Sequence, residues 1–253
     1  MRVSEDRWLS EIFEYSVFKI ESDPAVDTTQ ASQLVSNHAS EQPVAMYYAK
    51  IATDQIELVR QLGKAGLYVV DVNMTFGLVD NKGPAHVSSP RYPLWSISEI
   101  NADQHEAVLA IAGSCFRYSR FHLDPLVPRK IANRIKHDWI LNYVRGQRGE
   151  KLFVASANGK LAGFLAVIAT ESGEKSGRTI DLVGVDKTFQ GQGAGQALGE
   201  FFIDYYRDRC DFLTVGTQGA NVPSIRLYQK LGFSLIKSEY VMHMHVRNGQ
   251  VQA

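Results

Sequence analysis

The stretch from Leu182 to Leu198, LVGVDKTFQGQGAGQAL, places three glycines within five residues. The apolar residues before it predict a strand that ends near Val185, and those after it predict a helix that begins near Gly193. Each glycine costs about 0.5–1 kcal/mol relative to alanine in regular structure, so three together indicate a special demand on the backbone. Backbone amides at a helix N-terminus attract anions, and glycines let a phosphate approach them without a Cβ in the way. The stretch therefore predicts a phosphate-binding loop.

Two familiar glycine loops fit this stretch poorly. A dinucleotide-binding loop requires G-x-G-x-x-G and an acidic residue after a second strand, whereas this sequence has G-x-G-x-G. A P-loop requires Gly-Lys followed by Ser or Thr, which is absent here. A plain turn stays an alternative until the flanking residues are considered.

The bulk composition describes an ordinary folded chain. Its 253 residues are 45% hydrophobic and 21% charged, which suits one large domain or two small ones. The 27 basic residues balance the 27 acidic ones, so no overall field draws the protein to nucleic acid or to an anionic membrane. The N-terminus lacks the features of a signal peptide, and no apolar run approaches ~18 residues. We expect a cytoplasmic protein without a membrane or nucleic-acid partner.

The order of the expected elements predicts an α+β protein. The first part has strands at 16–20, 44–51 and 67–76 and helices at 28–40 and 54–65. The second part has helices at 102–115, 126–144, 193–208 and 222–231, and strands at 151–156, 161–170, 179–185, 212–216 and 233–246. Such mixing predicts helices packed on a largely antiparallel sheet.

A turn-rich segment divides the chain. Residues 79–93 contain three prolines and a glycine, so we predict an N-terminal domain at 1–78, a linker at 79–97 and a second domain at 98–253. Aligning Gly66 with Gly232, an offset of 232 − 66 = 166, matches LVRQLGKAGLYVVDVNMTF to SIRLYQKLGFSLIKSEYVM. Because glycine commonly ends helices, this match fits either a duplication or a common joint. The first part has no triple-glycine loop.

Two ordered motifs resemble the GCN5-related N-acetyltransferase (GNAT) superfamily. Gln190-x-x-Gly193-x-Gly195 resembles its Q/R-x-x-G-x-G/A loop, and NVPSIRLYQKLGF (221–233) resembles its N-x-x-A-x-x-x-Y-x-x-x-G-F motif, with Ser224 in the small-residue position. The resemblance covers roughly residues 98–246. It implies a mostly antiparallel sheet that splays at an acetyl-CoA site, preceded by a degenerate half of the same kind.

The resemblance also implies roles for individual residues. The splayed strand would pair with the pantetheine arm through Leu182, Val183 and Val185, and Asn221 would contact the same arm. The pyrophosphate of acetyl-CoA would be wrapped by the amides of the loop residues Gln190, Gly191, Gln192, Gly193, Ala194, Gly195 and Gln196. Tyr228 would direct its hydroxyl at the sulfur and act as general acid, since a phenol with a pKa near ~10 can protonate a leaving thiolate. Alternatively, Tyr228 only packs on an amphipathic helix.

A narrower resemblance concerns the acceptor. Residues 112–128, 139–150 and 216–233 resemble the dTDP-fucosamine acetyltransferase branch of sugar-nucleotide acetyltransferases, which also implies a homodimer. In that branch the segment RYSRFHLD would border the acceptor, with Arg117 and Arg120 suited to phosphate or carboxylate and His122 or Asp124 suited to accept a proton. The alternative is a solvated loop with one structural arginine.

No metal site is predicted. Cys115 and Cys210 lack metal-ligand spacing and are expected to be buried. His243 and His245 share one face of a strand, but we find no third ligand in the sequence and expect both to be exposed.

Three hypotheses follow. The first is an acetyl-CoA-dependent N-acetyltransferase that acts on the amine of a nucleotide-linked amino sugar for surface polysaccharide. The second keeps the reaction but changes the acceptor to a protein N-terminus, a polyamine or a drug. The third is a non-catalytic acyl-CoA-binding module, against which the intact Tyr228 and Asn221 argue.

Overall fold

A computed structural model describes residues 1–21, 30–79 and 94–252. The strands are β1 (Arg2–Glu5), β2 (Ser16–Glu21), β3 (Val44–Ala52), β4 (Tyr68–Val79), β5 (Ser96–Glu99), β6 (Lys151–Ala157), β7 (Lys160–Ser172), β8 (Lys175–Val185), β9 (Phe212–Gln218), β10 (Ser234–Arg247) and β11 (Gln250–Gln252). The helices are α1 (Arg7–Phe13), α2 (Ala31–Ser40), α3 (Ile56–Lys64), α4 (His105–Ala112), α5 (Arg120–Leu123), α6 (Arg129–Val144), α7 (Ala194–Tyr206) and α8 (Val222–Lys230), with 3-10 turns η2 (Ala102–Gln104) and η3 (Lys187–Phe189).

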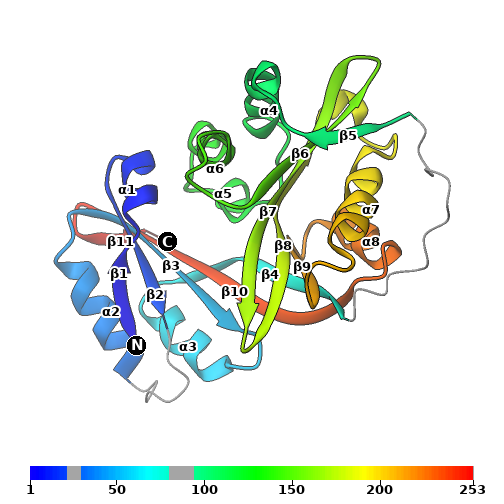
Figure 1. The fold of residues 1–253 in the computed structure, drawn as a ribbon. Helices are drawn as coiled ribbons and strands as arrows, with labels where there is room; N and C mark the ends of the chain where they lie inside the picture. The colour runs from blue at the N-terminus through cyan, green and yellow to red at the C-terminus, as the bar shows by residue number, and fades with distance from the viewer. Residues whose placement is uncertain (22–29, 80–93, 253) are drawn as a thin grey trace.

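One sheet runs through the whole described part in the order β1-β2-β3-β10-β4-β9-β8-β7-β6-β5, with β11 beside β10 (Figure 1). Only β2 with β3 and β8 with β9 run parallel among the described pairs. The α+β class and the mostly antiparallel sheet are therefore confirmed. Residues 80–93 of the predicted linker and the first two residues of the predicted helix 28–40 lie outside the described residues.

Every predicted helix and strand is present, with ends shifted by a few residues. The sequence reading missed β1, α1, β5, α5 and β11, which contain 4, 7, 4, 4 and 3 residues. Elements this short cannot establish a hydrophobic period, because the pattern needs a window of about 11–18 residues.

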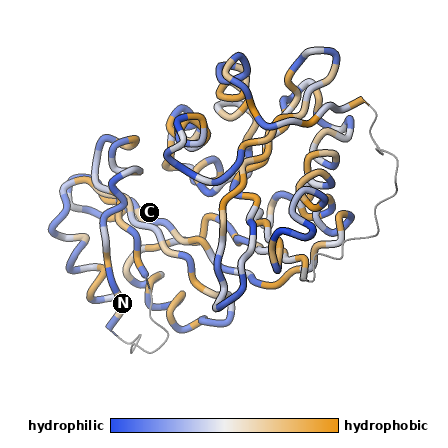
Figure 2. Tube along the Cα trace, viewed as in Figure 1, coloured by the Kyte–Doolittle hydropathy of each residue, from blue (hydrophilic) through white to orange (hydrophobic). Residues whose placement is uncertain are grey.

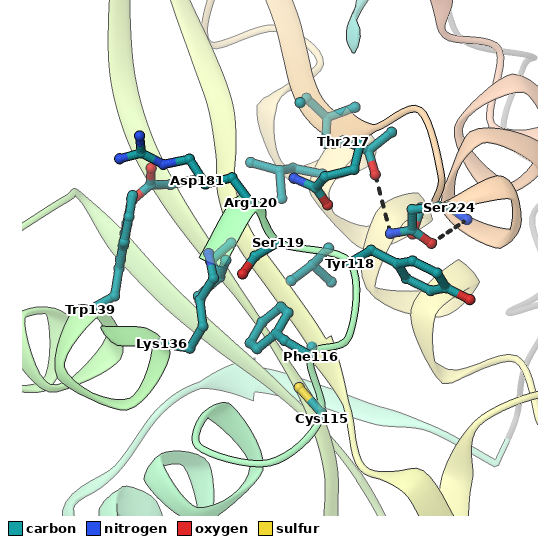
Figure 3. A pocket seen from close by; sticks show the side chains of 18 of the residues that line it. Cys115, Phe116, Tyr118, Ser119, Arg120, Lys136, Trp139, Asp181, Thr217 and Ser224 are labelled. Atoms are coloured by element: carbon teal, nitrogen blue, oxygen red, sulfur yellow. Dashed lines mark hydrogen bonds between the residues drawn. The ribbon is translucent and has the colours of Figure 1, made fainter. Parts of the chain in front are cut away.

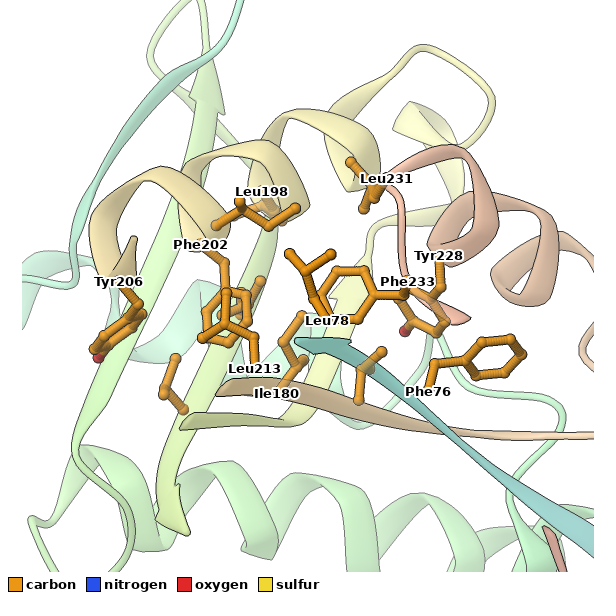
Figure 4. Packing of buried hydrophobic residues seen from close by; sticks show 14 of the residues in the cluster. Phe76, Leu78, Ile180, Leu198, Phe202, Tyr206, Leu213, Tyr228, Leu231 and Phe233 are labelled. Carbon is orange, nitrogen blue, oxygen red and sulfur yellow. The ribbon is translucent and has the colours of Figure 1, made fainter. Parts of the chain in front are cut away.

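Helices cover both faces of the sheet and bury its apolar side chains (Figure 1). On one face, α7 and α8 pack over the sheet through a cluster that includes Phe202, Leu213 and Phe233 (Figure 4). On the other face, α4 and α6 close a second cluster around Phe164 and Ile140. The hydrophobic residues follow the central strands and the inner sides of the helices, while hydrophilic residues gather at the turns (Figure 2).

The two halves exchange their last strands in a symmetric way. β10 lies between β3 and β4, and β4 lies between β10 and β9. Asn73 pairs with Glu239, and 239 − 73 = 166, the offset of the sequence match. The bulges on this ladder leave out Val70 and Ile236, which also differ by 236 − 70 = 166.

The neighbouring ladders obey the same offset. Glu239 pairs with Ala52, while Asn73 pairs with Gln218, and subtracting 166 from Glu239 and Gln218 gives positions 73 and 52. Gly66 and Gly232 end the matching helices with φ of +101° and +92°. This twofold register supports an internal duplication, and the sheet is continuous across the predicted domain boundary. The division into domains at 1–78 and 98–253 stays a prediction.

In the described part of the chain, no helix combines the length and the apolar character needed to cross a membrane.

Candidate active site

The sheet opens between β8 and β9. These strands pair only from Gly177 with Phe212 to Ile180 with Val215, although β8 continues to Val185 and β9 to Gln218. On its other side β8 stays paired with β7 as far as Val185. The segment that contains Leu182, Val183 and Val185 therefore has one open backbone edge, as the resemblance implied.

The glycine loop follows this open segment. Asp186 accepts a hydrogen bond from the Thr188 amide at 2.8 Å, and α7 begins at Ala194 after Gly193. Gly191 and Gly193 have φ of +78° and +92°, a left-handed conformation that disfavours other residues. Among the described residues no side chain caps this helix start, so its first amides are available to an anion.

Gly195 differs from the other two glycines. It lies in the first turn of α7 without a left-handed φ, and a Cβ there would meet Leu227 and Val185 at ordinary distances of 3.6 and 3.7 Å. The free protein would therefore accept a larger residue at this position. Close approach of a ligand to the backbone is a reason for glycine here.

The loop and the open strand edge border a cavity of about 1310 Å³ that reaches α6 and the first half of the chain (Figure 3). This exceeds the ~300–1,000 Å³ usual for a site that holds one small ligand. Of the predicted cofactor residues, those lining the cavity are Leu182, Val183, Val185, Gln190, Gly191, Gly193, Ala194, Gly195, Gln196 and Asn221. Gln192 does not line it, and its side-chain amide donates to the Thr188 carbonyl at 2.7 Å.

Asn221 and Tyr228 meet the cavity from α8. Asn221 caps this helix by accepting from the Ser224 amide at 3.4 Å, and its own amide donates to Thr217 Oγ1 at 3.2 Å (Figure 3). Tyr228 is 3% exposed and its ring lies 6.1 Å from that of Phe76, within the core shown in Figure 4. It nevertheless lines the cavity, so the packing and catalytic interpretations are compatible.

Burial raises the pKa of the Tyr228 phenol, and a hydrogen bond with the Ser224 side chain only partly opposes this. The hydroxyl therefore stays protonated throughout the neutral range.

The predicted acceptor segment divides into two sets. Arg117 and Arg120 line the cavity, whereas His122 and Asp124 do not. His122 lies 2.6 Å from Ser119 Oγ and 2.9 Å from Asn133 Oδ1. Asp124 is 2% exposed and accepts from the Tyr68 hydroxyl at 2.8 Å. The short helix α5 turns these two side chains away from the cavity, so the structure provides no acceptor contact for them.

The prediction that His243 and His245 are exposed is wrong. They are 0% and 2% exposed, and their ring nitrogens lie 2.6 and 2.9 Å from one oxygen of Asp124. β10 is an interior strand of the sheet, and Asp124 follows α5 directly in the chain, which a single-strand pattern cannot reveal.

Asp124 is the third ligand-type group that the sequence reading did not find. The ligand atoms of Asp124, His243 and His245 lie within 4.8 Å of one another. The carboxylate hydrogen-bonds both imidazoles directly, which accounts for the cluster without an ion. Burial would raise the pKa of Asp124, but the hydrogen bonds from both histidines hold it well below its usual range.

Among the charged cavity-lining residues that sequence reasoning did not assign to the site are Lys50 on β3, Asp71 on β4 and Lys136 on α6. Asp71 is 7% exposed, and burial raises its pKa to about 6 despite hydrogen bonds from the Val72 and Gly219 amides. Lys136 is 8% exposed, and burial lowers its pKa to about 8. Two sequence signals could have indicated these residues: Asp71 is a charge inside the apolar run LYVVDV, and Lys136 is a charge on the apolar face of α6.

Asp181 ties the open strand to α6. Its carboxylate accepts from Trp139 Nε1 and the Tyr143 hydroxyl, both at 2.8 Å, and from two nitrogens of Arg148 at 2.8 and 3.0 Å. These bonds fix β8 one residue before Leu182, where the sheet opens.

A model of the acetyltransferase (GNAT) family matches residues 106–233, half of the chain. The chain belongs to this family, and the class that its fold and motifs define is that of an acetyltransferase enzyme.

Particular relatives extend this assignment. The spore coat polysaccharide biosynthesis protein SpsD of Bacillus subtilis (strain 168) is 29% identical over 153 residues, which are 60% of this chain and 51% of SpsD. The chain thus matches about half the length of this curated relative. A GCN5-related N-acetyltransferase from Sphaerobacter thermophilus has the same fold, with a TM-score of 0.62 and 14% identity over 92% of this chain and 73% of its own. A tandem GNAT protein from the clavulanic acid biosynthesis pathway also has this fold, with a TM-score of 0.58. Its sequence is 13% identical, and the match covers 90% of this chain and 75% of that protein.

Proposed function

We propose that this protein is an acetyl-CoA-dependent N-acetyltransferase that acylates the amine of a nucleotide-linked amino sugar for surface polysaccharide. The observation that carries the reaction is the meeting, at one cavity, of an open strand edge, a glycine loop and Tyr228. The predicted cytoplasmic location and homodimer remain part of this proposal.

The cavity suits acetyl-CoA as cosubstrate. The uncapped first turn of α7 offers amides for the pyrophosphate, and Gly195 leaves room for close approach. The open edge of β8 at Val183 and its neighbours would hold the pantetheine arm. When bound, the cosubstrate supplies a thioester carbonyl that an amine can attack.

Tyr228 would serve the leaving sulfur. Because burial raises its pKa, the phenol stays protonated at neutral pH and can donate a hydrogen bond. The thiolate of the leaving group is disfavoured in the same dry surroundings, which makes it a better acceptor of that proton.

Asp71 would accept the proton of the attacking amine. Three aspartates line the cavity, and two are occupied: Asp181 by Arg148 and its neighbours, and Asp6 by the Tyr48 hydroxyl at 2.8 Å. Within the described residues, Asp71 accepts hydrogen bonds from the Val72 and Gly219 amides and from no side chain. With a pKa of about 6, it is mostly ionised at pH 7–8 yet basic enough to take a proton.

The acceptor class rests on two observations. SpsD is named for spore coat polysaccharide biosynthesis, and the segments around residues 112–128 and 139–150 resemble sugar-nucleotide acetyltransferases. Arg117 and Arg120, which line the cavity, suit the phosphates of such an acceptor. An acceptor of another kind, such as a protein N-terminus or a polyamine, is the second candidate within the same reaction.

The test is the release of free CoA thiol from acetyl-CoA with a panel of acceptors: dTDP- and UDP-linked amino sugars, a polyamine and short peptides. Selective turnover of an amino-sugar nucleotide is expected. Turnover only of peptides or the polyamine would refute the acceptor and leave the acetyl transfer, and no thiol release with any acceptor would favour a non-catalytic acyl-CoA-binding module.

A further inference from the structure

Lys136 is a buried cation in the cavity wall that, among the described residues, forms no ion pair with a carboxylate. Its nitrogen lies 4.9 Å from the Trp139 ring and 5.3 Å from the Phe116 ring, and the side chain extends toward Ser119 (Figure 3). Among the described residues, no carboxylate oxygen lies within the 4.0 Å of an ion pair. A buried charge is costly unless it is paired, and cation–π contacts of about 0.5–2 kcal/mol offset only part of that cost.

Arg120 repeats this pattern on the neighbouring wall. Its guanidinium carbon lies 3.9 Å from the centre of the Tyr48 ring, and one nitrogen lies 3.5 Å from His243 Nε2. In the described residues it also lacks a carboxylate within 4.0 Å. Burial is the largest cause that lowers the pKa of Lys136, and the positive charge of Arg120 is the second. The two cations therefore repel each other.

Two acids act on these cations from a distance, because the charge of Asp181 raises the pKa of Lys136 and that of Asp6 raises the pKa of Arg120, but burial outweighs both and each acid is already bonded to other groups. Asp181 is paired with Arg148, and Asp6 is held by the Tyr48 hydroxyl and the Leu9 amide. Asp71 has Lys50 as its nearby cation. Lys50 lines the same cavity from the first half of the chain, so both halves contribute positive charge to it.

We propose that Arg120 and Lys136, with Lys50 of β3, form a subsite for an anionic group, phosphate or carboxylate, that the acceptor carries beside its amine. The inference rests on the proposed function in one respect: the acceptor enters this cavity. The guanidinium of Arg120 can donate two parallel hydrogen bonds to two oxygens of such a group. The ammonium of Lys136, beside the Phe116 and Trp139 rings, adds a second positive charge.

A binding measurement tests the subsite without turnover. The full chain is saturated with CoA, which occupies the cosubstrate's own phosphate sites, and inorganic pyrophosphate or succinate is titrated by calorimetry. Wild-type protein is expected to bind at least one of them, and Lys136→Met to weaken that binding at least ~10-fold, as loss of a charged hydrogen bond predicts. Lys136→Arg should restore most of it, and Lys130→Met, an exposed position on the same helix, should leave it unchanged.

The outcomes are distinct. Binding of pyrophosphate alone identifies phosphate as the recognised group, succinate alone identifies carboxylate, and both identify anionic charge. No binding of either anion to wild type, or equal binding by Lys136→Met, would overturn the proposal. If the acceptor panel fails while this binding succeeds, the proposed reaction is refuted and the anion subsite stands.

A second readout excludes a merely structural lysine. Because burial holds the pKa of Lys136 at about 8, a bound anion should raise it, and at pH 8 binding should take up more protons in wild type than in Lys136→Met, where any change comes from the anion itself. Calorimetry in buffers of different ionisation enthalpy measures this uptake. The variant should melt no lower than wild type, because methionine replaces a buried charge without leaving a cavity.

Discussion

The two halves of this protein share one plan, yet in the part that the structure describes only the second has a parallel strand pair that separates. In the second half, the parallel pair β8 and β9 separates after Ile180, and the gap becomes part of the cavity wall. In the first half, the matching pair β2 and β3 stays joined from Ser16 to Ile20, nearly the whole length of β2. A ligand can reach a backbone edge only where the ladder hydrogen bonds stop.

The segments that follow β2 and β8 also differ between the two halves. Residues 186–193, before α7, carry glycines at positions 191 and 193, whereas residues 22–29, before α2, have no glycine and include Asp23 and Asp27. A segment of this composition lacks the glycines that a phosphate-binding loop before a helix requires. Duplication of a fold therefore does not duplicate its site, because the site depends on a few backbone positions.

The first half nonetheless contributes charged side chains to the cavity. Its strand β4 brings Asp71 to the cavity, and β3 brings Lys50. The exchange of β4 and β10 explains this, because each half inserts a strand into the sheet of the other. The comparison thus predicts a division of labour, with the cosubstrate on the second half and the proton acceptor on the first.

The largest expected effect is on the second half. Tyr228→Phe should lower kcat about 10²–10³-fold, because the leaving sulfur loses its proton donor, with KM for acetyl-CoA nearly unchanged. Steady-state thiol release measures this. Tyr206→Phe, which removes a buried hydroxyl bonded to Glu150 at 2.9 Å outside the cavity, should keep kcat near wild type. Full turnover by Tyr228→Phe would reduce Tyr228 to a packing residue.

The next largest effect tests the first half. Asp71→Asn should lower kcat/KM about 10²-fold and abolish the acidic limb of the pH profile. In wild type that limb should bend near pH 6, the pKa to which burial raises Asp71, because only the ionised carboxylate accepts a proton. Below the bend, activity should fall tenfold per pH unit. A profile unchanged by Asp71→Asn would assign the proton to another group and make the first half a scaffold.

A third prediction concerns the joint between the halves. Asp124 bonds Tyr68 on β4 and both histidines on β10, so Asp124→Asn should cost about 3 kcal/mol of unfolding free energy. Urea denaturation measures this. Since the folded state holds the pKa of Asp124 below its usual range, this stability is present above pH ~4 and is lost as the pH falls further. A loss below about 0.5 kcal/mol would show that the cluster does not couple the halves.

The smallest effect separates two glycines. Gly195→Ala should weaken CoA binding about tenfold without lowering the melting temperature, because its Cβ meets only ordinary contacts in the free protein. Gly66 has a φ of +101°, and a Cβ added there would lie 2.6 Å from Val251 Cγ1. Gly66→Ala should therefore destabilise the fold by about 1–2 kcal/mol and leave CoA affinity unchanged. Calorimetry with CoA and thermal melts measure both. Unchanged affinity in Gly195→Ala would exclude close approach of the ligand at that residue.

The candidate site was predictable where its residues are neighbours in the chain. The loop from Gln190 to Gly195, Asn221 and Tyr228 belong to two short motifs, and each lines the cavity apart from Gln192. The side chains from separate elements were not predictable. Asp71 and Lys136 are 65 positions apart, since 136 − 71 = 65, and only the packing of β4 and α6 brings both to one cavity.

The sequence by itself determined the α+β class, the order of the long elements and the glycine loop, because local periodicity and glycine chemistry act over a few residues. It also carried the offset of 166 between the halves. Only the tertiary structure decided the strand exchange, the closed first pair of parallel strands, and the burial of His243 and His245 on Asp124. The strand exchange and the histidine cluster depend on contacts between residues more than a hundred positions apart, and the pairing of Ser16 with Ala45 joins residues 45 − 16 = 29 positions apart. A pattern read along one segment does not contain such contacts.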